Sequence, residues 1–147
     1  MKVEISDTFH FPPEIIFAVL TDIRCHSDWL SGTIELASLS EHPARLGTKW
    51  EHFSDLLGRR VLISNKCNLY KTNSKFGWVT IKPLAFQTTF FLQPGSDSTG
   101  LGCGMEWEST GVAHMAEPLL VKETSERVAK SLAGMKTYLL TYTKPTK

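Results

Sequence analysis

The sequence predicts an α+β fold, in which a curved antiparallel sheet of seven strands wraps around one long C-terminal helix, with two short helices after the first strand. Three observations lead to this fold class. Short runs of residues alternate between apolar and polar side chains. Between residues 32 and 111, turn signals separate such runs every eight to twelve residues, which is typical of an antiparallel meander. Residues 117–143 then change to helical spacing.

The N-terminal part is expected to form one strand and two short helices. Alternation up to Phe9 predicts the strand, which Pro12 and Pro13 end. The same prolines suit the first turn of a helix over residues 12–23, because the first turn needs no backbone N–H donor. Residues 24–30 are expected to form the second short helix.

Six further strands and a long helix are expected after residue 32. The strands are predicted at residues 33–39, 48–54, 59–70, 76–81, 86–92 and 103–110. The apolar side of the helix is formed by Val121, Val128, Leu132, Met135 and Leu139. Gly134 lies inside this helix and predicts a close contact with another element rather than a break. A single helix gripped by a curved sheet leaves room between the two layers, so we expect a cavity there.

Length and charge indicate one domain without a strongly charged partner. A chain of 147 residues is expected to fold as a single domain over residues 1–147. Sixteen Lys and Arg residues oppose fifteen Asp and Glu residues, which gives a net charge of +1. This balance predicts no binding to nucleic acid. No segment approaches the roughly 18 apolar residues of a membrane-spanning helix, so no stable membrane insertion is expected.

The cysteines predict free thiols and no metal site. Cys25, Cys67 and Cys103 are odd in number and far apart, which favours a reducing, cytoplasmic setting. Cys25, His26 and Asp28 are all potential zinc ligands. Their spacing of i, i+1 and i+3 does not let them converge from one helix, so we interpret them as the end of a short helix.

Several segments, taken in order, resemble the SRPBCC or START-like superfamily and, within it, the polyketide cyclase/dehydrase-like branch. They are "FHFPPEIIFAVLTDIRCHSDWL", "RLGTKWE", "LGRR", "FGW", "FFLQPGSDSTG" leading to "MEWE", and "LAGMKTYL". The resemblance implies the helix-grip fold and says little about the ligand. It also implies that Asp22 and Trp29 belong to a helix-turn-helix that closes one end of the grip, with Asp22 as a cap of the second helix.

The alternation of the late strands predicts which side chains face the helix. In "CGMEWES", Cys103, Met105 and Trp107 are expected to point inward, while Glu106 and Glu108 face water. The same test applied to the other strands and to the helix yields the residues expected to line a ligand pocket. These are Trp50, His52, Asn65, Trp78, Thr88, Phe90, Met105, Trp107, Thr124, Val128, Ser131 and Met135.

Inward polar groups are the best indicators of a pocket, because an unpartnered buried one costs about 1–3 kcal/mol. His52 and Asn65 are such groups, and His52 is the single, weak candidate for a general base. Arg127, toward the rim of the helix face, is expected either to pair with Glu123 one turn away or to meet a ligand carboxylate.

Three functions from different classes are compatible with these residues. The leading hypothesis is a module that binds a small hydrophobic molecule, such as a lipid, a polyketide or an aromatic metabolite. The alternatives are a cyclase or dehydratase that uses the same pocket, and a protein-partner module with "DLLG" as an apolar loop. No cofactor and no metal are expected, because P-loop, HExxH and GxSxG motifs are absent from the sequence. The oligomeric state is left open.

Overall fold

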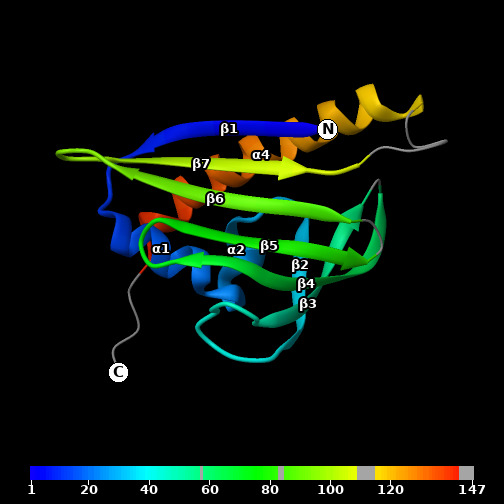
Figure 1. The fold of residues 1–147 in the computed structure, drawn as a ribbon, viewed down its shortest axis with the longest axis horizontal. Coiled ribbons are helices and arrows are strands. Elements are labelled where there is room, and N and C mark those ends of the chain that lie inside the picture. Colours follow the sequence, from blue (N-terminus) through cyan, green and yellow to red (C-terminus); the bar gives the residue numbers. More distant parts are fainter. Residues whose placement is uncertain (57, 83–84, 109–114, 143–147) are drawn as a thin grey trace.

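A computed structural model describes residues 1–56, 58–82, 85–108 and 115–142 of the chain (Figure 1). It contains seven strands and a long helix in the predicted order. The strands are β1 (Lys2–Phe9), β2 (Thr33–Leu39), β3 (Lys49–Leu56), β4 (Arg59–Lys71), β5 (Lys75–Lys82), β6 (Phe86–Pro94) and β7 (Thr99–Glu106). The helices are α1 (Pro13–Thr21), a 3-10 turn η1 (Ile23–Cys25), α2 (His26–Trp29) and α4 (Glu117–Leu139). The predicted fold class is thereby confirmed.

All seven strands belong to one antiparallel sheet with the order β1-β7-β6-β5-β4-β3-β2. The meander from β2 to β7 pairs each strand with the next, and β1 then adds to the free edge of β7. In this register Val3 lies opposite Met105, and Met105 lies opposite Thr88. The pairing of β1 with β7 brings the N-terminus beside the strand that leads into the C-terminal helix.

The long helix α4 crosses behind the sheet, where it packs mainly against β1, β7 and α2 (Figure 1). Its buried side, predicted from the apolar spacing, includes Val128, Leu132, Met135 and Leu139. Since β1 and β7 hold one half of the sheet against α4, the strands β3 to β5 curve around the other side of the helix. The room left between that curved half and α4 is where the cavity forms.

The predicted close contact at Gly134 is confirmed. A Cβ at this position would lie 2.6 Å from the backbone carbonyl oxygen of Trp29, at the end of α2. Side chains do not tolerate such an approach to backbone atoms, so glycine is what lets α4 reach α2.

We expect Gly134→Ala to lower the free energy of unfolding by about 1–3 kcal/mol, because overpacking outweighs the gain in helix propensity of about 1 kcal/mol. Urea denaturation measures the change. Gly104→Ala is the matched control, because a Cβ there finds its nearest neighbour at 3.8 Å. Equal stability of both variants would show that the contact at Gly134 relaxes freely.

The elements depart from the prediction at their ends and in one capping role. The last strand spans Thr99–Glu106 instead of residues 103–110, of which 109 and 110 lie outside the described residues.

The expected cap at Asp22 is wrong: its side chain makes no capping hydrogen bond. One of its carboxylate oxygens instead lies 3.6 Å from Arg24 Nε and 3.7 Å from His42 Nδ1, so the carboxylate serves an ion pair.

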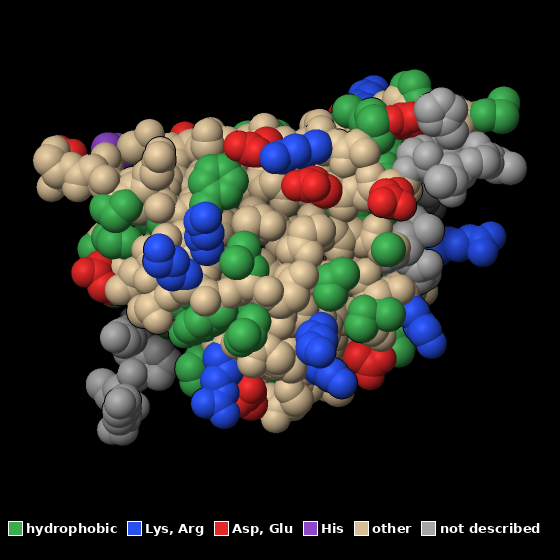
Figure 2. Space-filling model, in the orientation of Figure 1, with side chains coloured by type: hydrophobic (Ala, Val, Ile, Leu, Met, Phe, Trp, Pro, Cys, Tyr) green, Lys and Arg blue, Asp and Glu red, His purple; other side chains and the backbone are tan. Residues whose placement is uncertain are grey.

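The outer surface carries charges of both signs. Figure 2 shows Lys and Arg side chains interspersed with Asp and Glu and with scattered hydrophobic side chains on the face viewed. Within the described residues, no helix combines the length and the apolar character needed to cross a membrane.

Candidate ligand-binding cavity

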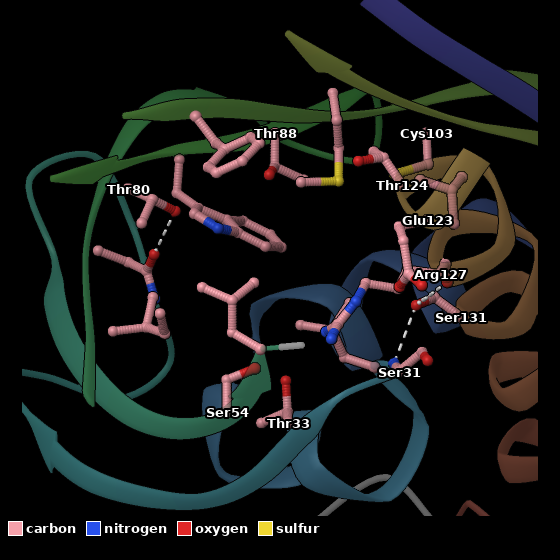
Figure 3. A pocket seen from close by; sticks show the side chains of 18 of the residues that line it. Ser31, Thr33, Ser54, Thr80, Thr88, Cys103, Glu123, Thr124, Arg127 and Ser131 are labelled. Carbon is pink, nitrogen blue, oxygen red and sulfur yellow. Dashed lines mark hydrogen bonds between the residues drawn. The ribbon is translucent and has the colours of Figure 1, made fainter. Parts of the chain in front are cut away.

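A partly enclosed cavity of about 180 Å³ lies between α4 and the curved half of the sheet. Its wall is mostly apolar and takes residues from β3 to β7, from α4 and from the segment 30–33 after α2. Figure 3 shows Thr88, Cys103 and Thr124 on one side of it and Ser54 and Thr33 on the other. The cavity therefore lies where one helix leaves part of a seven-stranded sheet uncovered.

Eight of the twelve side chains expected to line a pocket lie in the wall of this cavity. They are His52, Asn65, Trp78, Thr88, Met105, Thr124, Val128 and Ser131. The two-residue period of the strands and the helical spacing of α4 therefore identified the correct faces of both layers.

The other four expected side chains lie outside the wall, in the core behind it. Trp50 stacks on Phe76 with the ring centroids 6.4 Å apart, and Phe90 packs edge-to-face on Trp29 at 5.7 Å. Trp107 packs on Phe86 with the ring centroids 5.7 Å apart, and Phe86 lines the cavity where Trp107 was expected to do so. Met135 is fully buried in the core. The alternation of side chains along a strand (its parity) shows which residues lie on the inner face of the sheet. It does not show which of them are covered by the helix and by other side chains.

The sequence did not predict several residues of the cavity wall. Ser54 and Thr80 continue the parity of His52 and Trp78 by one more step, so the signal for them was present. The segment 30–33 has no periodicity that could have placed it. Hydrogen bonds hold it at the cavity: the Ser31 backbone N–H donates to Ser131 Oγ at 2.9 Å (Figure 3), and the Ser54 hydroxyl donates to the Gly32 carbonyl at 2.8 Å.

A chain of hydrogen bonds crosses three neighbouring strands in the wall. The Thr80 hydroxyl donates to Asn65 Oδ1 at 2.7 Å, and Asn65 Nδ2 donates to His52 Nδ1 at 3.2 Å. The sheet holds the first two side chains together, since Asn65 lies opposite Thr80 in the register of β4 and β5. Burial lowers the pKa of His52 to about 4, so its imidazole is uncharged near neutral pH. With Nδ1 as acceptor, the single ring proton is on Nε2.

Arg127 closes one side of the cavity. Its guanidinium donates a hydrogen bond to the Asp55 backbone carbonyl and lies over Gly32, where a Cβ would collide with Nη1. The expected ion pair between Arg127 and Glu123 is therefore not formed, although both residues line the cavity. Gly32 has φ +85°, a left-handed conformation that also favours glycine. Arg127 thus links α4 to β3 across the segment before β2.

The segment with Cys25, His26 and Asp28 does not have the geometry of a metal site. The Cys25 thiol donates to the Asp22 carbonyl at 3.0 Å, and His26 Nε2 donates to the Leu20 carbonyl at 2.8 Å. Asp28 is exposed, whereas Cys25 and His26 are buried. Burial raises the pKa of the Cys25 thiol to about 11 and lowers that of His26 to about 4. These groups satisfy backbone carbonyls at the junction of α1, η1 and α2.

We expect treatment with a chelator to leave the melting temperature of the purified protein unchanged, because no described group of three or more potential ligands converges. Thermal unfolding followed by circular dichroism, with elemental analysis of the same sample, measures this. A large fall in melting temperature together with stoichiometric zinc would contradict it.

No model of a known protein family matches the sequence, and no curated protein matches it. Solved structures do match. The protein TTHA0849 from Thermus thermophilus is 18% identical, with a TM-score of 0.77 over 98% of this chain and 100% of that one. A START superfamily protein from Mycobacterium smegmatis is 18% identical, with a TM-score of 0.72 over 94% and 98%. The Aha1 dimer from Colwellia psychrerythraea is 16% identical, with a TM-score of 0.69 over 95% and 96%. The chain therefore has the START-like, or SRPBCC, helix-grip fold.

Proposed function

We propose that this protein binds a small hydrophobic molecule in the cavity between α4 and the sheet. The observation that carries the proposal is a cavity of about 180 Å³ with a mostly apolar wall and a few placed polar groups. An apolar cavity of about 150 Å³ is large enough for benzene. The volume therefore favours a ligand that places one aromatic ring in the cavity, and because the cavity is only partly enclosed, a larger apolar molecule can extend out of it.

An enzyme of the cyclase or dehydratase kind is the second candidate, and one observation favours it. Glu123 of α4 lines the same cavity as His52 of β3, so a carboxyl group and an imidazole border one space from opposite layers. The lowered pKa of His52, about 4, argues against it because such an imidazole is a weak base near neutral pH. Burial also raises the pKa of the Cys103 thiol in the wall to about 12, which keeps it protonated and unreactive.

A protein-partner module receives the least support. In the "DLLG" segment, Leu56 lines the cavity, while residue 57 lies outside the described residues. The free, buried state of Cys25, Cys67 and Cys103 supports the proposal that the protein works in the cytoplasm.

Filling the cavity tests the proposed function. We expect Thr124→Phe to reduce binding of an apolar fluorescent probe, N-phenyl-1-naphthylamine, at least about tenfold, because the added ring occupies the space that the probe needs. Thr124 lines the cavity from α4. Glu126→Phe adds the same ring to an exposed position of the same helix and is the matched control.

Binding is measured by fluorescence titration, with circular dichroism to show that both variants are folded. Unchanged binding to a folded Thr124→Phe variant would contradict the proposal. Turnover of a panel of linear polyketides or hydroxylated aromatics, lost in both His52→Ala and Glu123→Gln, would instead establish the enzyme.

A further inference from the structure

The hydrogen-bonded chain in the cavity wall ends in a donor that has no protein partner. His52 is 7% exposed and lines the cavity from β3. In the part of the chain that the structure describes, the Asn65 amide is the single hydrogen-bond partner of its imidazole. The remaining ring nitrogen, Nε2, has no hydrogen-bond partner among the described residues, and it is not one of their fully buried unpartnered polar atoms, which include Nδ1 of His26. Since His52 lines the cavity, Nε2 is the ring nitrogen left for a molecule bound there.

The orientation of this donor is held by the two residues before it in the chain of hydrogen bonds. The Thr80 hydroxyl has one proton, and it donates that proton to Asn65 Oδ1. The opposite side of the amide, Nδ2, is then the side that faces His52 Nδ1. Thr80 and Asn65 are both buried, so bulk water has little access to these groups. The hydrogen bonds thus select the imidazole tautomer in which Nε2 carries the proton.

We propose that His52 Nε2–H makes the cavity selective for apolar ligands that carry a hydrogen-bond acceptor, such as a ketone or ester carbonyl. The proposal rests on the ligand-binding function above and names the class of ligand. A buried donor that stays unpaired raises the free energy of a complex, and a carbonyl removes that cost whereas a hydrocarbon does not. Sites built around one polar group discriminate against isosteres that lack the matching group. His52 is thus a specificity-determining residue.

Acetophenone and α-methylstyrene test this selectivity, because they have the same shape and differ by a carbonyl oxygen in place of a CH₂ group. Competition with N-phenyl-1-naphthylamine measures both dissociation constants. The ratio of the two constants in wild type is compared with the ratio in His52→Leu, so that differences in hydration cancel. In His52→Leu we expect the dissociation constant of acetophenone, divided by that of α-methylstyrene, to be about fivefold to tenfold higher than in wild type. This change is the equivalent of one hydrogen bond. His10→Leu, the same change at an exposed histidine, should leave the ratio unchanged.

Nitrogen-15 NMR of the His52 ring shows which ring nitrogen carries the proton. If His52 had a purely structural role, these signals would not respond to the ligand. We expect a protonated Nε2 and a bare Nδ1 near neutral pH, with both signals shifting when acetophenone binds. Asn65→Asp replaces the donor to Nδ1 by an acceptor, so a ring that stays neutral should carry its proton on Nδ1 and the preference for the ketone should disappear. The same spectrum distinguishes this neutral ring from an imidazolium, in which both nitrogens are protonated and the preference is kept.

Three results separate the outcomes. If both ligands bind and the ratio stays the same in His52→Leu, the selectivity fails while the proposed function stands. A wild-type ring with its proton on Nδ1 also overturns the selectivity. If neither ligand binds and N-phenyl-1-naphthylamine does not bind either, the proposed function fails and the selectivity fails with it.

Discussion

Replacing Trp78 with leucine should weaken binding of an apolar fluorescent probe about tenfold, whereas the same change at Trp107 should leave the affinity within about twofold. Both indoles are buried, at 4% and 7% exposure, but only Trp78 lines the cavity. An aromatic face that covers about 60 Å² of a ligand contributes about 1.5 kcal/mol at 25 cal/mol per Å². Trp107 lies behind Phe86 and contributes through packing alone.

The two variants also control for each other's loss of stability. Each removes a buried ring, so each should lower the free energy of unfolding by a few kcal/mol, about 2–4. Trp78→Leu should lower the free energy of unfolding more than Trp107→Leu. The centroid of the Trp78 ring lies 5.5 Å from that of Trp50, 5.8 Å from that of Phe90 and 5.6 Å from that of His26. Urea denaturation gives the stability, and fluorescence titration of the folded variants gives the affinity.

Equal loss of binding in the two variants would mean that the probe does not use this cavity. His52→Ala should have a smaller effect than Trp78→Leu on a probe without an acceptor, because one neutral hydrogen bond contributes about 1 kcal/mol. The apolar walls then account for affinity and His52 for selectivity.

The fold could be read from the sequence because each local pattern agrees with the final structure. Pro12 and Pro13 lie at the start of α1, and the alternation read from residue 103 onward falls within β7 up to Glu106. The pairing of β1 with β7 could not be derived, because contacts between residues about a hundred positions apart leave no local pattern. The resemblance to the START-like superfamily implied a cap at Asp22, whereas the folded chain brings Arg24 and His42 to its carboxylate.

The site was predictable as a face but not as a volume. Period-two parity put His52, Asn65 and Trp78 on the inner face, and all three reach the cavity. The same parity put Trp50 and Phe90 on that face, yet other aromatic rings bury them. Where the wall ends depends on how far the sheet curves from α4, which is a property of the whole packing. The segment 30–33 enters the wall through long-range hydrogen bonds, from the Ser31 N–H to Ser131 and from Ser54 and Asp55 to the Gly32 carbonyl, and no local pattern encodes these contacts.

Stability should fall steeply as the pH is lowered from near neutral toward 4, because two buried histidines must stay uncharged in the folded protein. Burial lowers the pKa of both His26 and His52 from 6.5 to about 4, and the nearby His52 contributes to the lowered pKa of His26. Between these values the unfolded chain binds more protons than the folded chain, so the free energy of unfolding decreases with falling pH. The stabilisation is complete above about pH 6.5 and is lost by about pH 4.

The expected loss is about 3 kcal/mol for each histidine, since one pKa unit corresponds to about 1.4 kcal/mol. The Asp7 carboxylate does not contribute to the change in stability over this pH range. Lys136 lowers the pKa of Asp7 below 3.8, so the stabilisation from this ion pair is lost only in stronger acid. Urea denaturation at about pH 7 and at about pH 5 measures the slope. His52→Gln and His26→Gln should each flatten this slope by removing one titrating ring. A wild-type protein with equal stability at the two pH values would show that the imidazoles titrate in the folded state as they do in water. In that case the uncharged His52 donor would be lost below neutral pH, and the cavity would present a cation to its ligand.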